Sequence, residues 1–252
     1  MRLKDKTAIV TGGGAGIGRA IAQRFANEGC AVVIADIDRE AGESAAQFIR
    51  DSGREAVFVP TDVANEDQVR AMTEQAHRHY GRVDVLCNNA AVLLFRQEAR
   101  AHELTAETWD RTIGVNLRGY WLCSKYVIPA MLRGGGGSII HLASPTGLFG
   151  FTRLTAYSAS KGGVIGLMRA MAADYAPDGI RVNAIVPGTI DTPMNALELA
   201  DPKMRDYYAA LTPARRLGLP QDIEGIAVFL ASDESAYCVG GVFTVDGGLT
   251  AV

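Results

Sequence analysis

Tyr157 and Lys161 are the residues whose types and spacing most clearly suggest chemistry. They lie four positions apart within residues 155–164, which read Thr-Ala-Tyr-Ser-Ala-Ser-Lys-Gly-Gly-Val. On a helix this spacing places a phenol and an ammonium on one face, one turn apart. Because an ammonium stabilises a phenolate, we expect Lys161 to lower the pKa of Tyr157 from about 10. Tyr157 is therefore a candidate general acid and base, although the same spacing also occurs on ordinary exposed helices.

Ser144 is a second candidate for contact with a reacting oxygen. It follows residues 138–142, Ser-Ile-Ile-His-Leu, which predict a strand. A hydroxyl in this place can polarise a substrate carbonyl by donating a hydrogen bond. A serine hydrolase is the rival interpretation. It is disfavoured because Ser144 lacks a Gly-x-Ser-x-Gly setting and all 4 histidines precede it in the chain.

A glycine-rich turn near the N-terminus lies between a predicted strand and a predicted helix. The strand covers residues 7–10, the turn reads Thr-Gly-Gly-Gly-Ala-Gly-Ile-Gly over residues 11–18, and the helix covers residues 19–28. A second strand at residues 31–35 then ends in Asp36. This order of elements is the dinucleotide-binding fingerprint, in which glycines and a helix N-terminus receive a pyrophosphate. We assign that contact to Gly12, Gly16, Ile17 and Gly18.

Asp36 bears on the choice of cofactor. A carboxylate at the end of the second strand can accept hydrogen bonds from the adenosine ribose diol, and it would repel a 2′-phosphate. The glycine turn contains no basic residue, and the first one after Asp36 is Arg39. The sequence therefore predicts NAD rather than NADP. The alternative role for Asp36 is a strand-end residue that only caps a turn.

Several motifs, in chain order, resemble those of the classical short-chain dehydrogenase/reductase family. One is the glycine spacing of the turn with Thr11 ahead of it. Residues 88–91, Asn-Asn-Ala-Ala, are similar to the family's Asn-Asn-Ala-Gly, with Ala91 in place of the glycine. Residues 115–119 match Val-Asn-x-x-Gly, and residues 187–193, Pro-Gly-Thr-Ile-Asp-Thr-Pro, resemble the family's loop at the nicotinamide. The resemblance covers nearly the whole chain.

This resemblance implies a catalytic tetrad of Asn116, Ser144, Tyr157 and Lys161. In the family the tyrosine exchanges a proton with the substrate oxygen, and the serine hydrogen-bonds that oxygen. The lysine lowers the tyrosine pKa and binds the nicotinamide ribose, so Tyr157 and Lys161 also count as cofactor-binding residues. Asn116 would distort its helix and hold a water that relays protons to the lysine.

The resemblance also implies cofactor contacts outside the glycine turn. Asp62 and Val63, which follow a predicted strand at residues 56–60, would border the adenine. Asp62 or Asn65 can also cap the following helix. Asn89 is a candidate ribose contact, with packing support for its strand as the alternative. The remaining contacts, next to the nicotinamide, are Pro187, Ile190 and Thr192.

The chain as a whole predicts one α/β domain over residues 1–252. We expect a doubly wound Rossmann fold with a seven-stranded, mainly parallel sheet and helices on both faces. Residues 105–131 read as one long helix. Residues 92–104 are irregular, solvated by default, and placed where they could border a substrate. Residues 194–216 are expected to form a helical substrate lid, and the resemblance implies a homotetramer.

Composition excludes several classes of function. The chain has 252 residues, is 48% hydrophobic and carries a net charge of −3, so it has no basic excess for nucleic acid or an anionic membrane surface. Its 4 cysteines are scattered without metal-ligand or redox spacing, so we expect reduced, buried thiols and no metal. Without a signal-peptide pattern or a membrane-length apolar run, a soluble, cytoplasmic protein is expected.

The expected reaction is NAD-dependent interconversion of a secondary alcohol and a ketone. The substrate class stays open among small hydroxy acids, sugar acids, polyols and cyclic alcohols. If the substrate is an acid, Arg153 and Arg205 are the candidates to bind its carboxylate, since a guanidinium matches a carboxylate bidentately. Two alternatives remain. One is an NADPH-dependent 3-ketoacyl reductase of the same fold, and the other is an NAD-binding regulator without turnover.

Overall fold

The computed structural model of the chain describes residues 1–251 and contains a central sheet in which every strand pair is parallel. The strand order is β3-β2-β1-β4-β5-β6-β7, and the chain reverses its direction of winding between β1 and β4. This is the doubly wound order expected from the sequence, and ligands bind at such a reversal, beyond the carboxyl ends of the strands. The strands are β1 (Thr7–Thr11), β2 (Ala31–Asp36), β3 (Ala56–Pro60), β4 (Val85–Asn88), β5 (Gly137–Leu142), β6 (Ile180–Pro187) and β7 (Val242–Val245).

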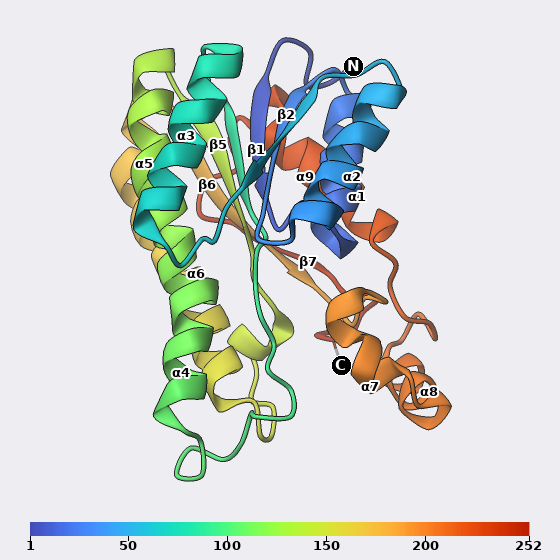
Figure 1. Cartoon of the computed structure of the whole chain (residues 1–252). Coiled ribbons are helices and arrows are strands. Elements are labelled where there is room, and N and C mark those ends of the chain that lie inside the picture. The colour runs from blue at the N-terminus through green and yellow to red at the C-terminus, as the bar shows by residue number, and fades with distance from the viewer. Residues whose placement is uncertain (252) are drawn as a thin grey trace.

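Helices cover both faces of the sheet, as predicted (Figure 1). One face is covered by α1 (Gly16–Asn27), α2 (Arg39–Asp51) and α9 (Gln221–Ala231). The other is covered by α3 (Glu66–Tyr80), α5 (Gly119–Gly134) and α6 (Thr155–Tyr175). Successive strand residues point to opposite faces, so Ile9 packs in the core on one side and Ala8 and Val10 in the core on the other.

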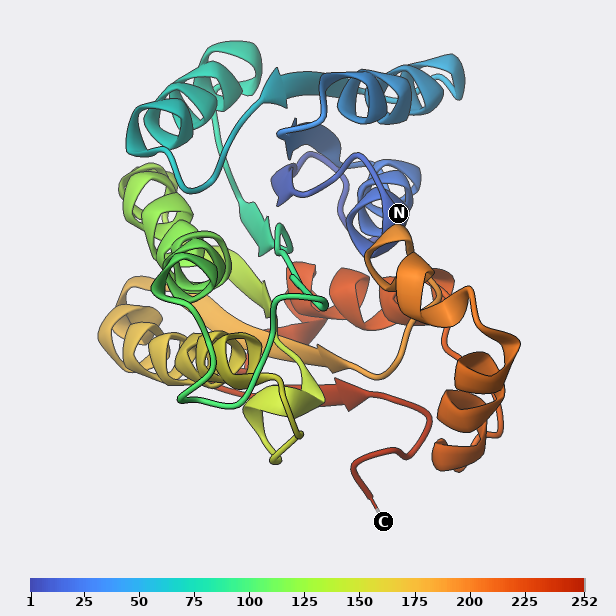
Figure 2. The ribbon, with the colours of Figure 1, turned by 60° about the horizontal axis from the view of Figure 1, so that its bottom comes forward.

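Three shorter helices lie beyond the carboxyl ends of the strands, at the bottom of Figure 1. They are α4 (Ala106–Ile113), α7 (Ala196–Leu199) and α8 (Pro202–Leu211). Figure 2 brings this edge forward and shows α7 and α8 on one side of it and the start of α6 on the other. Most of the candidate site residues are at this edge, which the parallel strands create by ending together.

The predicted long helix at residues 105–131 is interrupted, which corrects the expectation of a single helix. It is α4 and α5 joined by a π-helical turn, Gly114–Arg118, and α5 runs on to Gly134. Asn116 lies in the π-helical turn, and its side chain forms hydrogen bonds with the backbone of Val92. Asparagine has a poor helix propensity, and π-helical turns often occur at functional sites.

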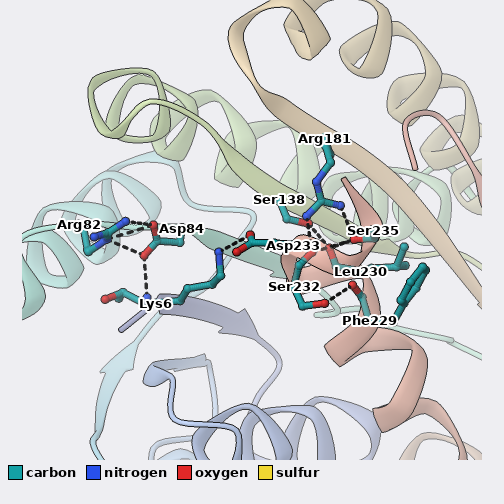
Figure 3. Close-up of polar contacts among 11 residues, drawn as sticks. Lys6, Arg82, Asp84, Ser138, Arg181, Phe229, Leu230, Ser232, Asp233 and Ser235 are labelled. Carbon is teal, nitrogen blue, oxygen red and sulfur yellow. Dashed lines mark hydrogen bonds and ion pairs between the residues drawn. The ribbon is translucent and has the colours of Figure 1, made fainter. Parts of the chain in front are cut away.

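The opposite, amino edge of the sheet is held by a polar network (Figure 3). The guanidinium of Arg181 on β6 donates to Ser235 Oγ at 2.6 Å and to the carbonyl of Ser232 at 3.1 Å. Lys6 Nζ pairs with Asp233 Oδ1 at 2.8 Å. Arg82 pairs with Asp84, which also accepts a hydrogen bond from the first residue of β1. The contacts of Lys6 and Arg181 tie the start of β1 and β6 to the segment after α9, and Asp84 ties β1 to the segment before β4. The three cations already have partners, so the network stabilises the fold.

We expect Arg181→Met to lower the free energy of unfolding by about 1.5–3 kcal/mol, because two hydrogen bonds from a half-buried charged donor are lost. Arg82→Met is the control, since its pair with Asp84 is more exposed and such pairs contribute roughly 0–1 kcal/mol. Urea unfolding of both variants measures the difference. Equal, small losses for the two variants would contradict a stabilising role for Arg181.

Candidate active site

Two adjoining cavities lie at the carboxyl edge of the sheet. The first, of about 190 Å³, is lined by the end of β5, the first turns of α6, the segment after β6, and α7 and α8. The second, of about 540 Å³, is lined by the glycine turn, the ends of β2 and β3, and residues of α4. The cavities share five residues: Ile17, Asn89, Ala91, Thr192 and Met194. The first therefore suits a substrate and the second an elongated dinucleotide next to it.

Ser144, Tyr157 and Lys161 line the first cavity together, as the sequence motifs imply. Ser144 follows β5 and begins a short 3-10 turn, Pro145–Gly147. Its Oγ accepts hydrogen bonds from the amide and the hydroxyl of Thr146, at 3.3 and 3.1 Å. Neither contact uses the Ser144 proton, which can be donated to the Tyr157 oxygen or to a molecule in the cavity.

The ammonium of Lys161 is buried between two aromatic rings. Lys161 is only 2% exposed. Its Nζ donates to the carbonyl of Leu142 at 2.7 Å, and lies 5.3 Å from the ring centroid of Tyr120 and 5.7 Å from that of Tyr157. The Tyr120 hydroxyl also lies 3.5 Å from this nitrogen. A cation in this position is attracted by both ring faces as well as by the carbonyl.

Burial changes the protonation of the Tyr157–Lys161 pair. It raises the pKa of Tyr157 to about 12, with a smaller opposing contribution from Ser144, and it lowers the pKa of Lys161 to about 7. The expected net lowering of the Tyr157 pKa is therefore wrong for the chain by itself, and a lowering contribution from Lys161 stays a prediction. The reason is that an uncharged phenol is favoured in a buried site, and Lys161 is only partly protonated at neutral pH.

Asn116 is fully buried and lines neither cavity. Its Oδ1 accepts from the Val92 amide at 2.8 Å, and its Nδ2 donates to the Val92 carbonyl at 2.9 Å. Nδ2 also lies 3.2 Å from Ser160 Oγ, which donates to the carbonyl of Tyr157. Asn116 thus joins the segment after β4 to the catalytic helix, and its role with a relay water stays a prediction.

The glycine turn has the geometry of a close backbone approach. Gly12 and Gly16 have φ values of 64° and 52°, which favour glycine. A Cβ at Gly18 would lie 2.1 Å from the carbonyl oxygen of Gly12, so only glycine fits there. Asn89 holds the turn from β4 by donating to the carbonyls of Thr11 and Gly12, both at 3.0 Å. Packing support and a cofactor contact are both compatible with this position, since Asn89 lines both cavities.

Asp36 lines the second cavity and is fixed to the glycine turn. One carboxylate oxygen accepts from the Gly14 amide at 2.8 Å, and the other from the Asp38 amide at 3.0 Å. Asp62 and Val63 line the same cavity, as expected for an adenine border. Of the two predicted caps for α3, the structure shows Asn65, whose side chain accepts from the amide of Gln68.

The loop after β6 joins the two cavities. Pro187, Ile190 and Thr192 line the first cavity, and Thr192 lines the second as well. Asn195 holds this loop by donating to the carbonyl of Ile190 at 2.8 Å. The loop is therefore placed where one end of a dinucleotide in the second cavity would meet a substrate in the first.

Arg153 and Arg205 do not line the substrate cavity. Arg205 pairs with Asp191 at 2.7 Å, and Arg153 lies 3.9 Å from Glu103 with its side chain 64% exposed. Their proposed role in carboxylate binding therefore receives no support from position, and it stays a prediction.

Among the described residues no histidine lines the first cavity, and His141 of β5 is unsuited to serve Ser144 as a base. His141 is buried, stacks on Tyr120, and has its pKa lowered to about 3 by burial and by Lys161. Its Nδ1 lies 3.2 Å from Asn88 Nδ2. Over residues 1–251 no group of three or more His, Cys, Asp or Glu side chains is arranged to hold a metal ion. Nor is any helix in that range long and apolar enough to cross a membrane.

Comparison with known proteins decides the family. Residues 12–250 match the family model described as enoyl-(acyl carrier protein) reductase. A probable short-chain type dehydrogenase/reductase of Bradyrhizobium diazoefficiens is 40% identical over 99% of this chain and 89% of the relative. The chain is a short-chain dehydrogenase/reductase. It is thus an oxidoreductase of a family that acts on CH–OH groups with a nicotinamide cofactor.

Two further relatives show the range of substrates in this family. The cis-4-hydroxycyclohexanecarboxylate dehydrogenase of Sinomonas cyclohexanicum is 41% identical to this chain, over 98% of this chain and 98% of the relative. A putative NAD(P)-dependent gluconate 5-dehydrogenase of Beutenbergia cavernae, solved with NADP at low occupancy, has a TM-score of 0.93 and 38% identity over 99% of this chain and 98% of its own. The short-chain dehydrogenase/reductase fold is thereby established, whereas these substrates belong to the relatives.

Glu98 is a positioning residue that the sequence analysis missed. It lies in residues 92–104, which were expected to be solvated by default or to border a substrate. Leu93 and Phe95 of this segment line the first cavity, and Glu98 is only 6% exposed. Its carboxylate accepts hydrogen bonds from the amides of Ala156 and Tyr157, at 3.1 and 2.8 Å. Glu98 thus caps the N-terminus of α6, where an anion is also favoured by the helix dipole. The one signal in the sequence was that Leu154, just before α6, offers no side-chain cap.

Glu98 also acts on Tyr157 through its charge, because a nearby carboxylate raises the tyrosine pKa. We expect Glu98→Gln to lower the pKa of Tyr157, because the phenolate loses a repulsive neighbour. The pH at which the Tyr157-dependent rate changes should then be lower than in the wild type. We also expect a loss of about 1–3 kcal/mol in unfolding free energy, because an amide cannot satisfy both backbone donors. Rate–pH profiles and urea unfolding measure the two effects.

Glu103→Gln is the matched control, since Glu103 lies on the same segment and is exposed. It should leave both the profile and the stability unchanged. A Glu98→Gln variant that loses stability but keeps the wild-type pH profile would reduce Glu98 to a purely structural cap.

Proposed function

We propose that this chain is an NAD-dependent dehydrogenase that interconverts a secondary alcohol and a ketone. The observation that carries this proposal is that Ser144, Tyr157 and Lys161 line one cavity, which adjoins a second cavity that contains the glycine turn and Asp36. The first set supplies acid–base and hydrogen-bonding groups, and the second suits a dinucleotide.

In this proposal each residue has a defined task. Ser144 donates its free proton to the substrate oxygen and orients it. Tyr157 gives a proton to that oxygen in reduction and removes one from the alcohol in oxidation. Lys161, in its protonated form, supplies positive charge next to Tyr157, and it binds the nicotinamide ribose. The bound nicotinamide ring supplies the hydride chemistry. The glycine turn, Asp62, Val63, Asn89, Pro187, Ile190 and Thr192 hold the cofactor.

The raised pKa of Tyr157 sets a direction for the pH dependence. A phenol with a pKa of about 12 keeps its proton at neutral pH, which suits donation to a ketone oxygen. Oxidation needs the deprotonated form, so its rate should increase as the pH rises above neutral. Reduction should depend much less on the ionisation of Tyr157 over the same interval, because the phenol stays protonated.

Asp36 favours NAD. Its two oxygens are fixed by backbone amides, so the carboxylate is held in place at the edge of the second cavity. Within residues 1–251 no lysine or arginine forms an ion pair with it. A 2′-phosphate would meet this negative charge. An NADPH-dependent 3-ketoacyl reductase is the second candidate, since the 3-oxoacyl-[acyl-carrier-protein] reductase of Thermotoga maritima is 37% identical to this chain over 99% of both chains.

The proposal is tested by following NADH formation with a panel of hydroxy acids, sugar acids, polyols and cyclic alcohols. Tyr157→Phe should reduce turnover roughly 10²–10⁴-fold, because it removes the proton-transfer group. Tyr175→Phe, at the far end of the same helix, is the control and should retain wild-type activity. If NADH binds but neither the panel nor its ketones react, the chain is better described as a non-catalytic, NAD-binding regulator.

The cofactor preference has its own test. Wild type should use NAD at least about tenfold more efficiently than NADP, and Asp36→Ala should reduce that ratio by about tenfold or more. Asp38→Asn, which keeps its cap on α2, is the control. If the wild type prefers NADP and acts best on 3-ketoacyl thioesters, the chain is an NADPH-dependent 3-ketoacyl reductase and the proposal is wrong.

Two wider expectations accompany the proposal. We propose that residues 194–216 act as a substrate lid. This segment borders the substrate cavity through Met194, Asn195, Glu198, Leu199 and Tyr208. A homotetramer is likewise proposed from the family resemblance, and sedimentation of the purified protein would measure it.

A further inference from the structure

The wall of the substrate cavity formed by α7 and α8 contains a carboxylate without a cationic partner. This wall, defined by Glu198, Leu199 and Tyr208, is called the α7–α8 wall below. Glu198 is half-buried, and within residues 1–251 no lysine, arginine or histidine lies within ion-pair distance of it. A half-buried charge of this kind needs hydrogen-bond donors.

Tyr208 supplies one such donor. Its hydroxyl donates to Glu198 Oε1 at 3.0 Å. Burial and the neighbouring Glu198 raise the pKa of Tyr208 to about 12, so it stays a protonated donor at neutral pH. In the described part of the chain, Glu198 Oε2 accepts no hydrogen bond, and Glu198 lines the cavity, so we expect this oxygen to accept one from a bound molecule.

The remaining residues that line the cavity are mostly apolar. They include Leu93, Phe95, Phe151, Leu154 and Met194. Among described residues the lining contains no arginine, and its one cation, Lys161, already donates to the carbonyl of Leu142. A substrate carboxylate would therefore enter an apolar site whose own charge at the α7–α8 wall is negative, where repulsion is poorly screened.

We infer that the substrate is an alcohol or ketone with an apolar body whose other end carries a hydrogen-bond donor, a hydroxyl or an ammonium, received by Glu198. This inference rests on the proposed function, because it places the reacting oxygen at Ser144 and Tyr157. It also separates this chain from a relative whose name specifies a hydroxycyclohexanecarboxylate. Carboxylate binding by Arg153 and Arg205 is the competing expectation.

Three ring compounds that differ only in the remote group test the inference. They are 4-aminocyclohexanol, cyclohexane-1,4-diol and 4-hydroxycyclohexanecarboxylate. Calorimetric titration into the protein saturated with NADH measures binding, and NADH formation from NAD measures oxidation. We expect the amine or the diol to bind at least about tenfold more tightly than the carboxylate, a difference of about 1.4 kcal/mol. Preference for the amine over the diol would identify the donor as an ammonium.

Glu198→Gln assigns this preference to the carboxylate. It should reduce the amine-to-carboxylate ratio by about tenfold, because the charge is removed while the side-chain shape is kept. Glu103→Gln, outside the cavity, is the control and should leave the ratio unchanged. Arg205→Met should also leave it unchanged, since Arg205 is paired with Asp191.

The outcomes separate this inference from the proposed function. Tightest binding of the carboxylate, an unchanged ratio in Glu198→Gln, a ratio changed by Arg205→Met, or no binding of any of the three compounds would overturn the inference. If the expected binding order is found but neither these compounds nor the wider panel of alcohols and ketones reacts, the proposed function fails while recognition by Glu198 stands.

Discussion

The site depends on placing the ammonium of Lys161 inside the protein, against the carbonyl of Leu142 and between the rings of Tyr120 and Tyr157. Removing an ammonium from water is costly, so the surrounding groups must recover much of that free energy. The carbonyl comes from the end of β5, one ring from α5 and the other from α6. The end of β5, α5 and α6 are therefore fixed relative to a single nitrogen atom.

That constraint explains features at some distance from Lys161. The π-helical turn before α5 turns Asn116 toward Val92, which joins the segment after β4 to α6. The same segment supplies Glu98, whose carboxylate fixes the first turn of α6 and so the backbone of Tyr157. Because the parallel strands end at one edge, the glycine turn and the loop after β6 meet this arrangement without long connections.

Much of this organisation could be predicted from the sequence because it rests on local patterns. Strand runs, the glycine turn and the four-residue spacing of Tyr157 and Lys161 are read within short windows, and together they indicated the fold and the family. Glu98 could not be predicted, since it acts on residues 58 and 59 positions away in the chain. The break in the helix at residues 105–131 also depends on a tertiary contact, between Asn116 and Val92.

The protonation and pairing of the charged side chains could not be predicted from the sequence either. Spacing predicts that Lys161 is near Tyr157, but it gives neither the burial of the pair nor the partners of Arg153 and Arg205. Burial reverses the expected direction for the Tyr157 pKa, and the pairing of Arg205 with Asp191 leaves Glu198 as the free charge at the α7–α8 wall. Both effects arise from desolvation and distance, which only a folded structure defines.

The most direct test of this account is an NMR titration of the protein with ¹³C at the lysine Cε and tyrosine Cζ positions, assigned with Lys161→Met and Tyr157→Phe. The account predicts that Lys161 titrates near pH 7, well below exposed lysines, and that Tyr157 remains a phenol at about pH 10. A Tyr157 that is already ionised at about pH 8, beside a Lys161 that keeps its proton, would show that attraction outweighs burial and would contradict the account.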